Sequence, residues 1–323
     1  LRVKAIDPDN TAAALSLGHL YLLMGNFEAG WAGHEARLKN RSAISTTYPQ
    51  PRWFGERSIE GKTILIHVDE GLGDTIQFAR YVPMLAARGA RVILVVQPAV
   101  RALLSKLPGA AQCFSRGVGA LPVFDVQCPI SSLPLAFGTQ LDTIPSGAQY
   151  LPSPPANLVQ AFEDRLGPHD RLRVGLVWSG NSNHSNDHNR SIHLRALSRI
   201  IDVDATFVSL QKDPRPHDKA TLCEWTGIID LTADLTDFVA TAALLSCLDL
   251  VITVDTSVAH LAGALGRPTW ILLPYVPDYR WLLDRDDSPW YPSVRLFRQT
   301  ETRDYASVLD RVRSELLMLV TAK

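Results

Sequence analysis

The spacing of apolar residues changes along the chain. Residues 1–40 have the pattern of helices, whereas from residue 61 onward short apolar runs alternate with amphipathic stretches. Apolar runs of this length, separated by longer amphipathic stretches, are typical of parallel βαβ units. We therefore predict an α/β protein whose strands are Thr63–Val68, Arg91–Val96, Val123–Cys128, Arg173–Val177, Thr206–Leu210, Ile228–Asp230, Leu250–Val254 and Thr269–Leu273.

The stretches between these strands predict helices and linkers. We expect an amphipathic helix over Asp74–Arg88, kinked at Pro83. Further helices are expected over Ala99–Leu107, 156–166, Asp237–Cys247, Val258–Leu265 and Arg303–Val320. The predicted domains are a helical repeat (1–40), a linker (41–60), an α/β domain (61–155), a second α/β domain (156–298) and a closing helix (299–323).

The first residues resemble one unit of a helical repeat. The segment from Leu17 to Tyr21 contains the L-G-x-x-Y core of a tetratricopeptide repeat, and Gly30 falls where the second helix needs a small residue. Pro8 fits the end of a preceding repeat, whereas His34 stands where such repeats usually have an aromatic residue. One unit cannot bury both of its faces, so we expect it to pack on the next domain or to continue a longer array. An ordinary helical hairpin is the alternative.

Composition narrows the classes of function. The 323 residues include 32 basic and 33 acidic side chains, a net charge of −1, which argues against a nucleic-acid-binding surface or a polybasic membrane anchor. The four cysteines form no C-x-x-C pair, so a zinc ribbon or a disulfide framework is not expected. No apolar run is long enough to span a bilayer, and no signal peptide is visible. We expect a cytoplasmic protein and, because the chain begins at Leu1, part of a longer one.

Two motif-like strings lack the spacing or setting that their chemistry requires. A G-x-G pair follows the first strand, but Ile76 stands where a dinucleotide fingerprint needs its third glycine. His184, His188 and His193 gather in a loop rich in Asn and Ser, where a polar loop around a ligand is favoured over a metal site. We therefore expect no cofactor and no metal.

The clearest candidate ligand site follows the strand Leu250–Val254. Asp255, Thr256 and Ser257 turn into a helix, and Thr and Ser commonly cap helices. The free N–H groups and the positive dipole end of a helix suit a diphosphate, and open α/β sheets bind ligands at the carboxyl ends of their strands. His260 lies one turn further along. The alternative is a capped packing helix with a core histidine.

An acidic loop occupies the corresponding place in the first α/β domain. Asp69, Glu70 and Asp74 crowd a turn that contains two glycines, which let a ligand approach the backbone closely. Like charges in a cleft raise the pKa of one carboxyl, which suits a general base. We take Asp74 as the candidate base; the alternative is that it only caps its helix.

Polar loops follow two strands of the second domain. The loop Ser179–Ser191 contributes Arg190, which can neutralise a phosphate through two parallel hydrogen bonds. After the next strand, Gln211 can contact a base or ribose and Lys212 a phosphate, although an ordinary surface lysine is equally expected. The candidate nucleotide or phosphate contacts are Ser179, Gly180, Asn181, Arg190, Gln211, Lys212, Asp255, Thr256, Ser257 and His260.

The segment Tyr275–Tyr291 is aromatic and charged. Asp278, Arg280 and Trp281 within it are candidate sugar or acceptor contacts, since aromatic rings beside carboxylates commonly hold sugars. The same residues would also suit the packed hinge of a two-domain enzyme.

Three motifs, in this order, resemble those of ADP-heptose:lipopolysaccharide heptosyltransferases, which are GT-B glycosyltransferases. They are GLGDTIQFARYVPML from Gly71, VGLVWSGN with HNRS from Val174 to Ser191, and VITVDTSVAHLAGALGRPTWILLP from Val251. The resemblance covers about residues 61–298. With the helical repeat, the layout is similar to bacterial proteins that place tetratricopeptide repeats before such a domain and, more distantly, to O-linked N-acetylglucosamine transferase.

This resemblance implies a GT-B fold, with two doubly wound Rossmann-like domains facing a cleft and the closing helix packed back on the first domain. It also implies inverting, metal-independent transfer of a sugar from a nucleotide-diphosphate sugar to a hydroxyl of a glycan or protein. Asp74 matches the acidic residue at which the family places its base, with Glu70, Gly73 and Gln77 on the acceptor side. Thr256 and Ser257 match the phosphate-binding turn. Ser257-Val258 and LLPYVPDYRWLL depart from the heptosyltransferase pattern, so neither the sugar nor the acceptor is implied.

Two other interpretations stay open. A sugar-nucleotide 2-epimerase uses the same double-Rossmann layout. A non-enzymatic scaffold would bind a protein partner through its repeat and keep the α/β part as a remnant. The intact set of Asp74 and Asp255 to His260 argues against the scaffold.

Overall fold

The computed structural model describes residues 7, 9–39, 48–117 and 119–322. The predicted repeat end at Pro8 and the first part of the predicted linker, 41–47, lie outside the described residues. The chain divides into two compact units: unit 1 is Leu1–Pro152 with Asp278–Asp284, and unit 2 is Ser153–Pro277 with Arg285–Lys323. The short segment 278–284 therefore belongs to the fold of unit 1, although its sequence neighbours belong to unit 2.

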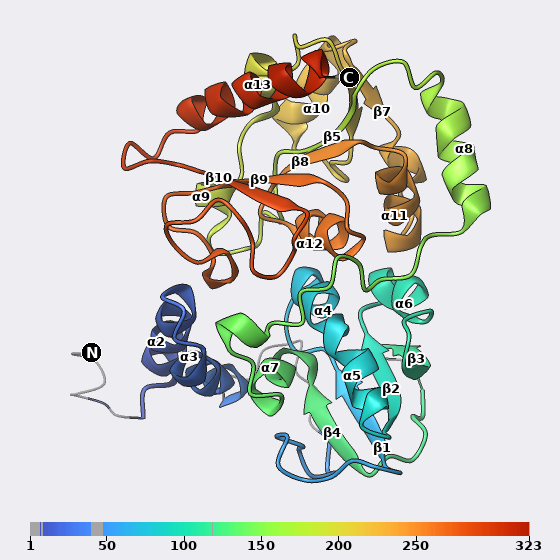
Figure 1. Ribbon diagram of the computed structural model, residues 1–323, viewed down its shortest axis with the longest axis vertical. Coiled ribbons are helices and arrows are strands. Elements are labelled where there is room, and N and C mark those ends of the chain that lie inside the picture. The colour runs from blue at the N-terminus through green and yellow to red at the C-terminus, as the bar shows by residue number, and fades with distance from the viewer. Residues whose placement is uncertain (1–6, 8, 40–47, 118, 323) are drawn as a thin grey trace. The chain divides into compact units, whose positions relative to one another are not determined.

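Unit 1 contains a four-stranded parallel sheet (Figure 1). Its strands are β1 (Thr63–His67), β2 (Arg91–Val96), β3 (Ala110–Ser115) and β4 (Val126–Pro129), in the order β3-β2-β1-β4. After β3 the chain returns to the other side of β1, so β1 and β4 flank a topological switch point. The predicted parallel sheet is confirmed here, although the sequence did not predict β3.

The helices of unit 1 follow the predicted pattern with one break. They are α4 (Leu72–Phe78), α5 (Val82–Ala87), α6 (Pro98–Leu104) and α7 (Leu133–Ala136). A 3₁₀ turn, Ala79–Tyr81, separates α4 from α5, and Pro83 lies in the first turn of α5, where its missing N–H costs no hydrogen bond. The predicted single helix with a kink at Pro83 is therefore two short helices, and the break precedes Pro83.

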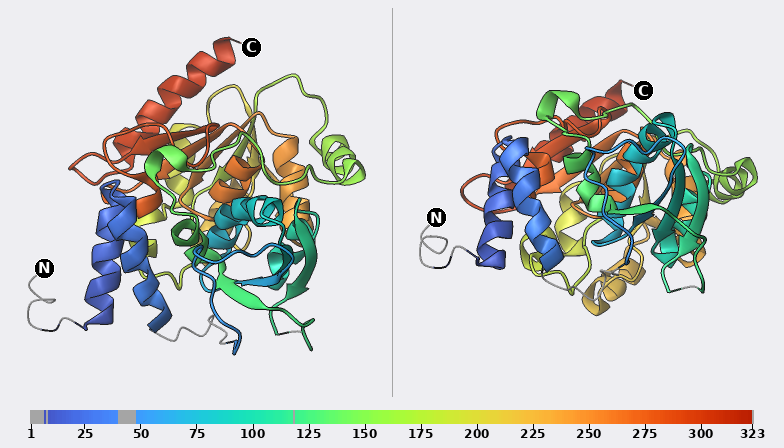
Figure 2. Two further views of the ribbon diagram at one scale, coloured as in Figure 1. Left: turned by 60° about the horizontal axis from the view of Figure 1, so that its bottom comes forward. Right: turned by 90° about the horizontal axis from the view of Figure 1, so that it is seen from below.

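The N-terminal part of unit 1 is a helical hairpin, formed by α2 (Thr11–Leu23) and α3 (Phe27–His34), which lie side by side (Figure 2). Each helix begins at an asparagine whose side chain accepts a backbone hydrogen bond, Asn10 in α2 and Asn26 in α3. A 3₁₀ turn, Glu35–Lys39, continues from α3. The hairpin itself was expected; its assignment to the tetratricopeptide class stays a prediction.

Unit 2 contains a six-stranded parallel sheet. Its strands are β5 (Arg173–Val177), β6 (Thr206–Ser209), β7 (Ile228–Asp230), β8 (Leu250–Val254), β9 (Thr269–Leu273) and β10 (Val294–Arg298), in the order β10-β9-β8-β5-β6-β7. The helices are α8 (Ala156–Leu166), α9 (Asp187–Arg190), α10 (Pro216–Glu224), α11 (Phe238–Ser246), α12 (Ser257–Ala264) and α13 (Ala306–Thr321). Here β5 and β8 flank the switch point. The sequence did not predict β10.

The closing helix α13 packs within unit 2 (Figure 1). Its apolar positions Val308, Leu309, Val312 and Leu316 are fully buried in the hydrophobic core that the strands of unit 2 line. Ion pairs flank this face, with 2.6 Å between Arg199 and Asp310. The prediction that the helix packs back on the first domain is therefore wrong, because its apolar face is already covered by the core of unit 2. Among the described residues, no helix is both long and apolar enough to cross a membrane.

Candidate active site

Two loops meet at the switch point of unit 1. Asp69 follows β1, and Ser131 and Ser132 follow β4. The Asp69 carboxylate is buried and accepts a hydrogen bond of 3.3 Å from the backbone N–H of Ser131. A ligand-binding crevice is expected at this edge, because the helices that follow neighbouring strands diverge there.

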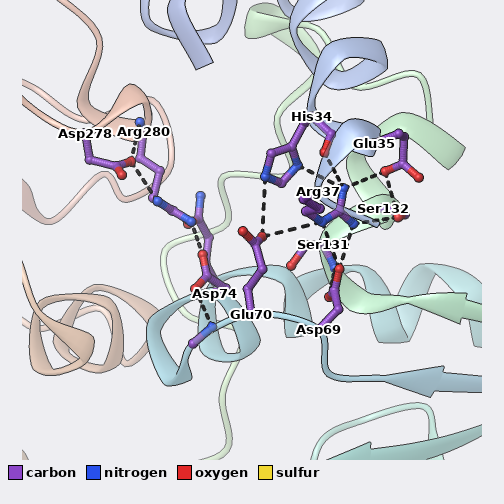
Figure 3. Close-up of polar contacts among 12 residues, drawn as sticks. His34, Glu35, Arg37, Asp69, Glu70, Asp74, Ser131, Ser132, Asp278 and Arg280 are labelled. Atoms are coloured by element: carbon purple, nitrogen blue, oxygen red, sulfur yellow. Dashed lines mark hydrogen bonds and ion pairs between the residues drawn. The ribbon is translucent and has the colours of Figure 1, made fainter. Parts of the chain in front are cut away.

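Asp74 uses its two carboxylate oxygens differently. Its Oδ2 accepts a hydrogen bond of 2.9 Å from the backbone N–H of Gly71, so Asp74 caps the first turn of α4. Its Oδ1 forms an ion pair with Arg280, which comes from the segment 278–284 (Figure 3). The Arg280 guanidinium also donates to Gln77 Oε1 at 2.6 Å and to Asp278 Oδ1 at 2.7 Å. Asp74 therefore caps its helix and also forms an ion pair, and its role as a base stays a prediction.

Glu70 lies between this pair and the helical hairpin (Figure 3). Its Oε2 is 3.4 Å from Nε2 of His34 and 3.8 Å from Nε of Arg37, yet it makes no hydrogen bond among the described residues. Burial alone would raise the pKa of Glu70, but His34, Arg37 and Arg280 outweigh burial and hold that pKa well below its usual range. The cations around Glu70 thus favour its carboxylate form.

The hairpin supplies this neighbourhood with a buried arginine. Arg37 donates to Asp69 Oδ2 at 2.8 Å, to Ser132 Oγ at 2.7 Å and to Glu35 Oε1 at 2.7 Å. Sequence reasoning missed this role of Arg37 and His34. The available signal was the departure from the repeat pattern, since a histidine replaced the usual aromatic residue at position 34.

Aromatic rings close the space between the hairpin and the segment 278–284. His19 stacks on Tyr279 with ring centroids 5.2 Å apart, and Tyr279 is buried. Burial, with the nearby charges of His34 and Arg280, lowers the pKa of His19 to about 4. Trp281 is fully buried, and Gly73 lies half-buried in the first turn of α4. Among the described residues, the buried hydroxyl of Tyr279 and the amide nitrogen of Gln77 make no hydrogen bond.

Several residues predicted to contact phosphate meet at the switch point of unit 2. The Arg190 guanidinium donates to the backbone oxygen of Asp255 at 3.0 Å, which joins the loop after β5 to the loop after β8. Gly180 lies directly beneath Arg190: a Cβ at this position would stand 2.7 Å from the guanidinium. Thr256 occupies the N-cap of α12 without using its side chain as a cap, and Ser257 is the first helical residue.

The other residues of unit 2 that were predicted to contact the nucleotide are not part of the hydrogen bond between Arg190 and Asp255. Gln211 joins β5 to β6, because its side-chain oxygen accepts from the backbone N–H of Trp178 at 3.1 Å and of Ser179 at 2.8 Å. Lys212 donates to the backbone oxygen of Leu235 and lines a cavity of about 660 Å³ beyond β6 and β7. His260 is buried, with Nδ1 2.9 Å from the hydroxyl of Tyr291, and Asn181 is exposed. The phosphate contact of His260 stays a prediction.

Comparison with known proteins bears on the activity. Residues 218–304 match the family described as Glycosyltransferase family 9 (heptosyltransferase). Protein FlbA of Caulobacter vibrioides is 26% identical over an alignment of 326 positions. The alignment covers 92% of this chain and 53% of FlbA, so the chain spans about half the length of that relative.

Solved structures show the same fold. A glycosyltransferase of family 9 from Veillonella parvula superimposes with a TM-score of 0.62 at 12% identity, over 83% of this chain and 99% of that one. The E. coli ADP-heptose lipopolysaccharide heptosyltransferase II superimposes with a TM-score of 0.56 at 17% identity. The superposition covers 80% of this chain and 99% of that one. These findings support the assignment of this chain as a glycosyltransferase. They agree with the resemblance of the sequence motifs to heptosyltransferases, and the parallel α/β fold matches that of the family-9 structures.

Proposed function

We propose that the protein transfers a sugar from a nucleotide-diphosphate sugar to an acceptor hydroxyl. The observation that carries the proposal is the switch point of unit 2, where Arg190, Gly180 and Asp255 are in contact beside the start of α12. A helix N-terminus next to a guanidinium is a suitable place for a diphosphate, because both present N–H donors and positive charge.

Unit 2 would bind the donor. The diphosphate would lie against the backbone N–H groups at Ser257 and Val258, with Arg190 beside it. The cavity lined by Lys212 and Lys219 opens beyond the carboxyl ends of β6 and β7 and would receive the nucleoside. Ser179 and Gln211 would hold the loop after β5 in place. Positive charge and helix dipole would stabilise the leaving diphosphate, so catalysis would need no metal ion.

Unit 1 would supply the base. Asp74 would take the proton of the acceptor hydroxyl while the oxygen of that hydroxyl attacks the anomeric carbon of the donor sugar. The bond from that carbon to the diphosphate would break on the opposite face, so the configuration would invert. Arg280 would orient Asp74 during this step.

The charges around Asp74 favour an acceptor without negative charge. Five carboxylates face two guanidinium groups here, those of Arg37 and Arg280. The carboxylates belong to Glu35, Asp69, Glu70, Asp74 and Asp278. A neutral hydroxyl of a glycan or of a protein is therefore the acceptor that we propose, with a hexose or heptose as the sugar. A protein partner on the helical hairpin and a cytoplasmic location belong to the same proposal.

The test replaces the base while leaving the donor site intact. Asp74→Asn should lower nucleoside diphosphate release from a panel of UDP-, GDP- and ADP-sugars by about 10²–10⁴-fold, the usual contribution of a general base. Nucleotide affinity should stay the same, since unit 2 is unchanged. Asp142→Asn, at an exposed carboxylate of the same unit, is the matched control. Loss of nucleotide affinity in Asp74→Asn would show instead that Asp74 is structural.

A further inference from the structure

Two histidines and an aspartate meet in unit 2, at a place that the proposed reaction does not use. His217 and Asp218 lie in the first turn of α10, and His193 immediately precedes the 3₁₀ turn Leu194–Arg199. One potential ligand atom from each of these three residues lies within 4.8 Å of the other two. The elements that carry them are separate in sequence, so the group forms only in the folded chain.

The distances suit a small cation. Nδ1 of His193 is 2.8 Å from Nε2 of His217, and that Nε2 is 3.4 Å from Oδ1 of Asp218. Ligands bound about 2.0–2.1 Å from a tetrahedral Zn²⁺ are about 3.3 Å apart. The distance between His217 and Asp218 already has this value, and the two imidazoles would need to separate by only about 0.5 Å. The His217 side chain is 50% exposed, so its ring is free to make this shift.

The charge of Asp218 adds an independent argument. Its side chain is only 1% exposed. Oδ2 accepts from the indole N–H of Trp178 at 3.1 Å, and Oδ1 accepts from the backbone N–H of Leu194 at 2.9 Å. Both donors are neutral, and among the described residues the only basic group within ion-pair distance is His217. A buried carboxylate is costly without a compensating charge, and a cation beside it would supply one.

The hydrogen bonds of Asp218 leave room for a metal ion. A carboxylate oxygen has two lone pairs, so Oδ1 can accept from Leu194 and still bind a cation. The donors Trp178 and Leu194 would then fix the orientation of the ligand, as the partners of metal-binding carboxylates usually do. His184 and His188, which the sequence places in the same loop as His193, do not belong to the group.

We propose that His193, His217 and Asp218 bind one divalent transition-metal ion, Zn²⁺ being the best match for two imidazoles and a carboxylate. The ion takes the place of the hydrogen bond between the two imidazoles: the ring that donates it carries its proton on the other ring nitrogen instead, both rings bind through lone pairs, and water completes the coordination. Its role is structural: it ties the turn Leu194–Arg199 to α10. It also fixes the end of the loop 179–191, since Ile192 next to His193 donates to the backbone oxygen of Trp178 at 2.8 Å.

The test uses the whole chain without an affinity tag, after treatment with EDTA. Zn²⁺ is titrated by calorimetry, and Co²⁺ is added as a spectroscopic probe whose visible absorption reports tetrahedral coordination. We expect one ion per chain and a rise in melting temperature that depends on Zn²⁺ concentration. His193→Gln and His217→Gln should each weaken Zn²⁺ binding by at least about tenfold and abolish the Co²⁺ absorption.

His188→Gln is the matched control, because it removes an exposed histidine of the neighbouring loop that lies outside the group. It should bind Zn²⁺ as the unsubstituted chain does. Both replaced ligands are also exposed, so a fold intact by circular dichroism is expected in all three variants. Absence of Zn²⁺ binding, or equal loss in the control, would overturn the proposal and leave the two imidazoles as a hydrogen-bonded pair.

Discussion

Asp74 illustrates how far residue chemistry can be inferred from a loop. Its place in an acidic, glycine-containing turn after a strand predicted a general base, with a helix cap as the alternative. The structure shows the cap and an ion pair with Arg280, and the role as a base stays a prediction. The partner could not be predicted in the same way. Arg280 lies 206 residues further along the chain, in a segment that only the fold brings to unit 1.

His34 and Arg37 were less accessible to sequence reasoning. Both lie in a stretch whose pattern indicates only a helix, and their importance comes from the loop against which that helix packs. Arg37 is almost completely buried, which is tolerable because four acceptors surround its guanidinium: His34, Glu35, Asp69 and Ser132. No periodicity contains this information, since it depends on a contact between residues 32 positions apart.

The half-buried ring of His19 gives a prediction about pH. Burial lowers the pKa of His19 from 6.5 to about 4, so the unfolded chain takes up a proton at a pH where the folded chain does not. The free energy of unfolding should therefore be highest above pH 6.5 and fall by up to about 3 kcal/mol toward pH 4. His19→Phe keeps a ring against Tyr279 and should remove this part of the slope, as measured by urea unfolding at several pH values.

The exposed histidine His188 serves as the comparison for this experiment. His188→Gln should leave the dependence on pH as it is. If His19→Phe and His188→Gln have the same slope as the unsubstituted chain, His19 is not buried in the neutral form.

Among the elements, the hairpin depends on contact between two backbones. A Cβ on Gly18 would lie 2.6 Å from the carbonyl carbon of Gly33 and 2.8 Å from the backbone nitrogen of His34. Helices α2 and α3 can approach this closely only because both positions are glycine. The L-G-x-x-Y pattern pointed to Gly18, but its partner Gly33 emerged only from the packing. The spacing of the two helices thus also sets the position of His34.

Gly18→Ala separates two effects of opposite sign. Helix propensity alone predicts that alanine stabilises α2 by about 1 kcal/mol. The clash with the backbone of α3 predicts the opposite, and we expect the free energy of unfolding to fall by about 1–3 kcal/mol in urea titrations. Ser16→Ala, at an exposed position of the same helix, should change it by less than about 0.5 kcal/mol. A stabilised Gly18→Ala protein would contradict the close contact.

Sequence reasoning missed the strands β3 and β10 and the packing surface of α13, because the patterns of these segments do not contain the necessary information. Strand β3 has the sequence AAQCFS and is only half-buried, so it lacks the branched apolar run that indicates a central strand. Strand β10 has the sequence VRLFR, in which two arginines interrupt and end a short apolar run, and it lies at the edge of its sheet. Helix α13 was predicted from its amphipathic pattern, but a pattern of this kind shows that one face is buried and not which surface buries it.

At the scale of the whole molecule, two parallel sheets each carry their candidate residues at a switch point. Loops after β1 and β4 bring together Asp69 and Ser131, and loops after β5 and β8 bring together Arg190 and Asp255. The order of strands and motifs in the sequence was sufficient to predict a parallel α/β fold and the loops after β1, β5 and β8, whereas the loop after β4 that contains Ser131 was not predicted. The assignment of 278–284 to unit 1 was not predictable, because its composition suits a hinge as well as a site.

Because the proposed donor site lies entirely within unit 2, nucleotides should stabilise the chain through that unit. Among UDP, GDP, ADP and CMP, we expect at least one nucleoside diphosphate to raise the melting temperature, since a ligand at about 100 times its dissociation constant adds about 2.7 kcal/mol. Arg190→Ala removes the guanidinium at the carboxyl end of β5 and should reduce that shift. Arg171→Ala removes an exposed arginine near the amino end of the same strand and should preserve it. Equal shifts in both variants would exclude Arg190 from the phosphate site, and no shift with any of the four nucleotides would contradict a nucleotide-sugar donor.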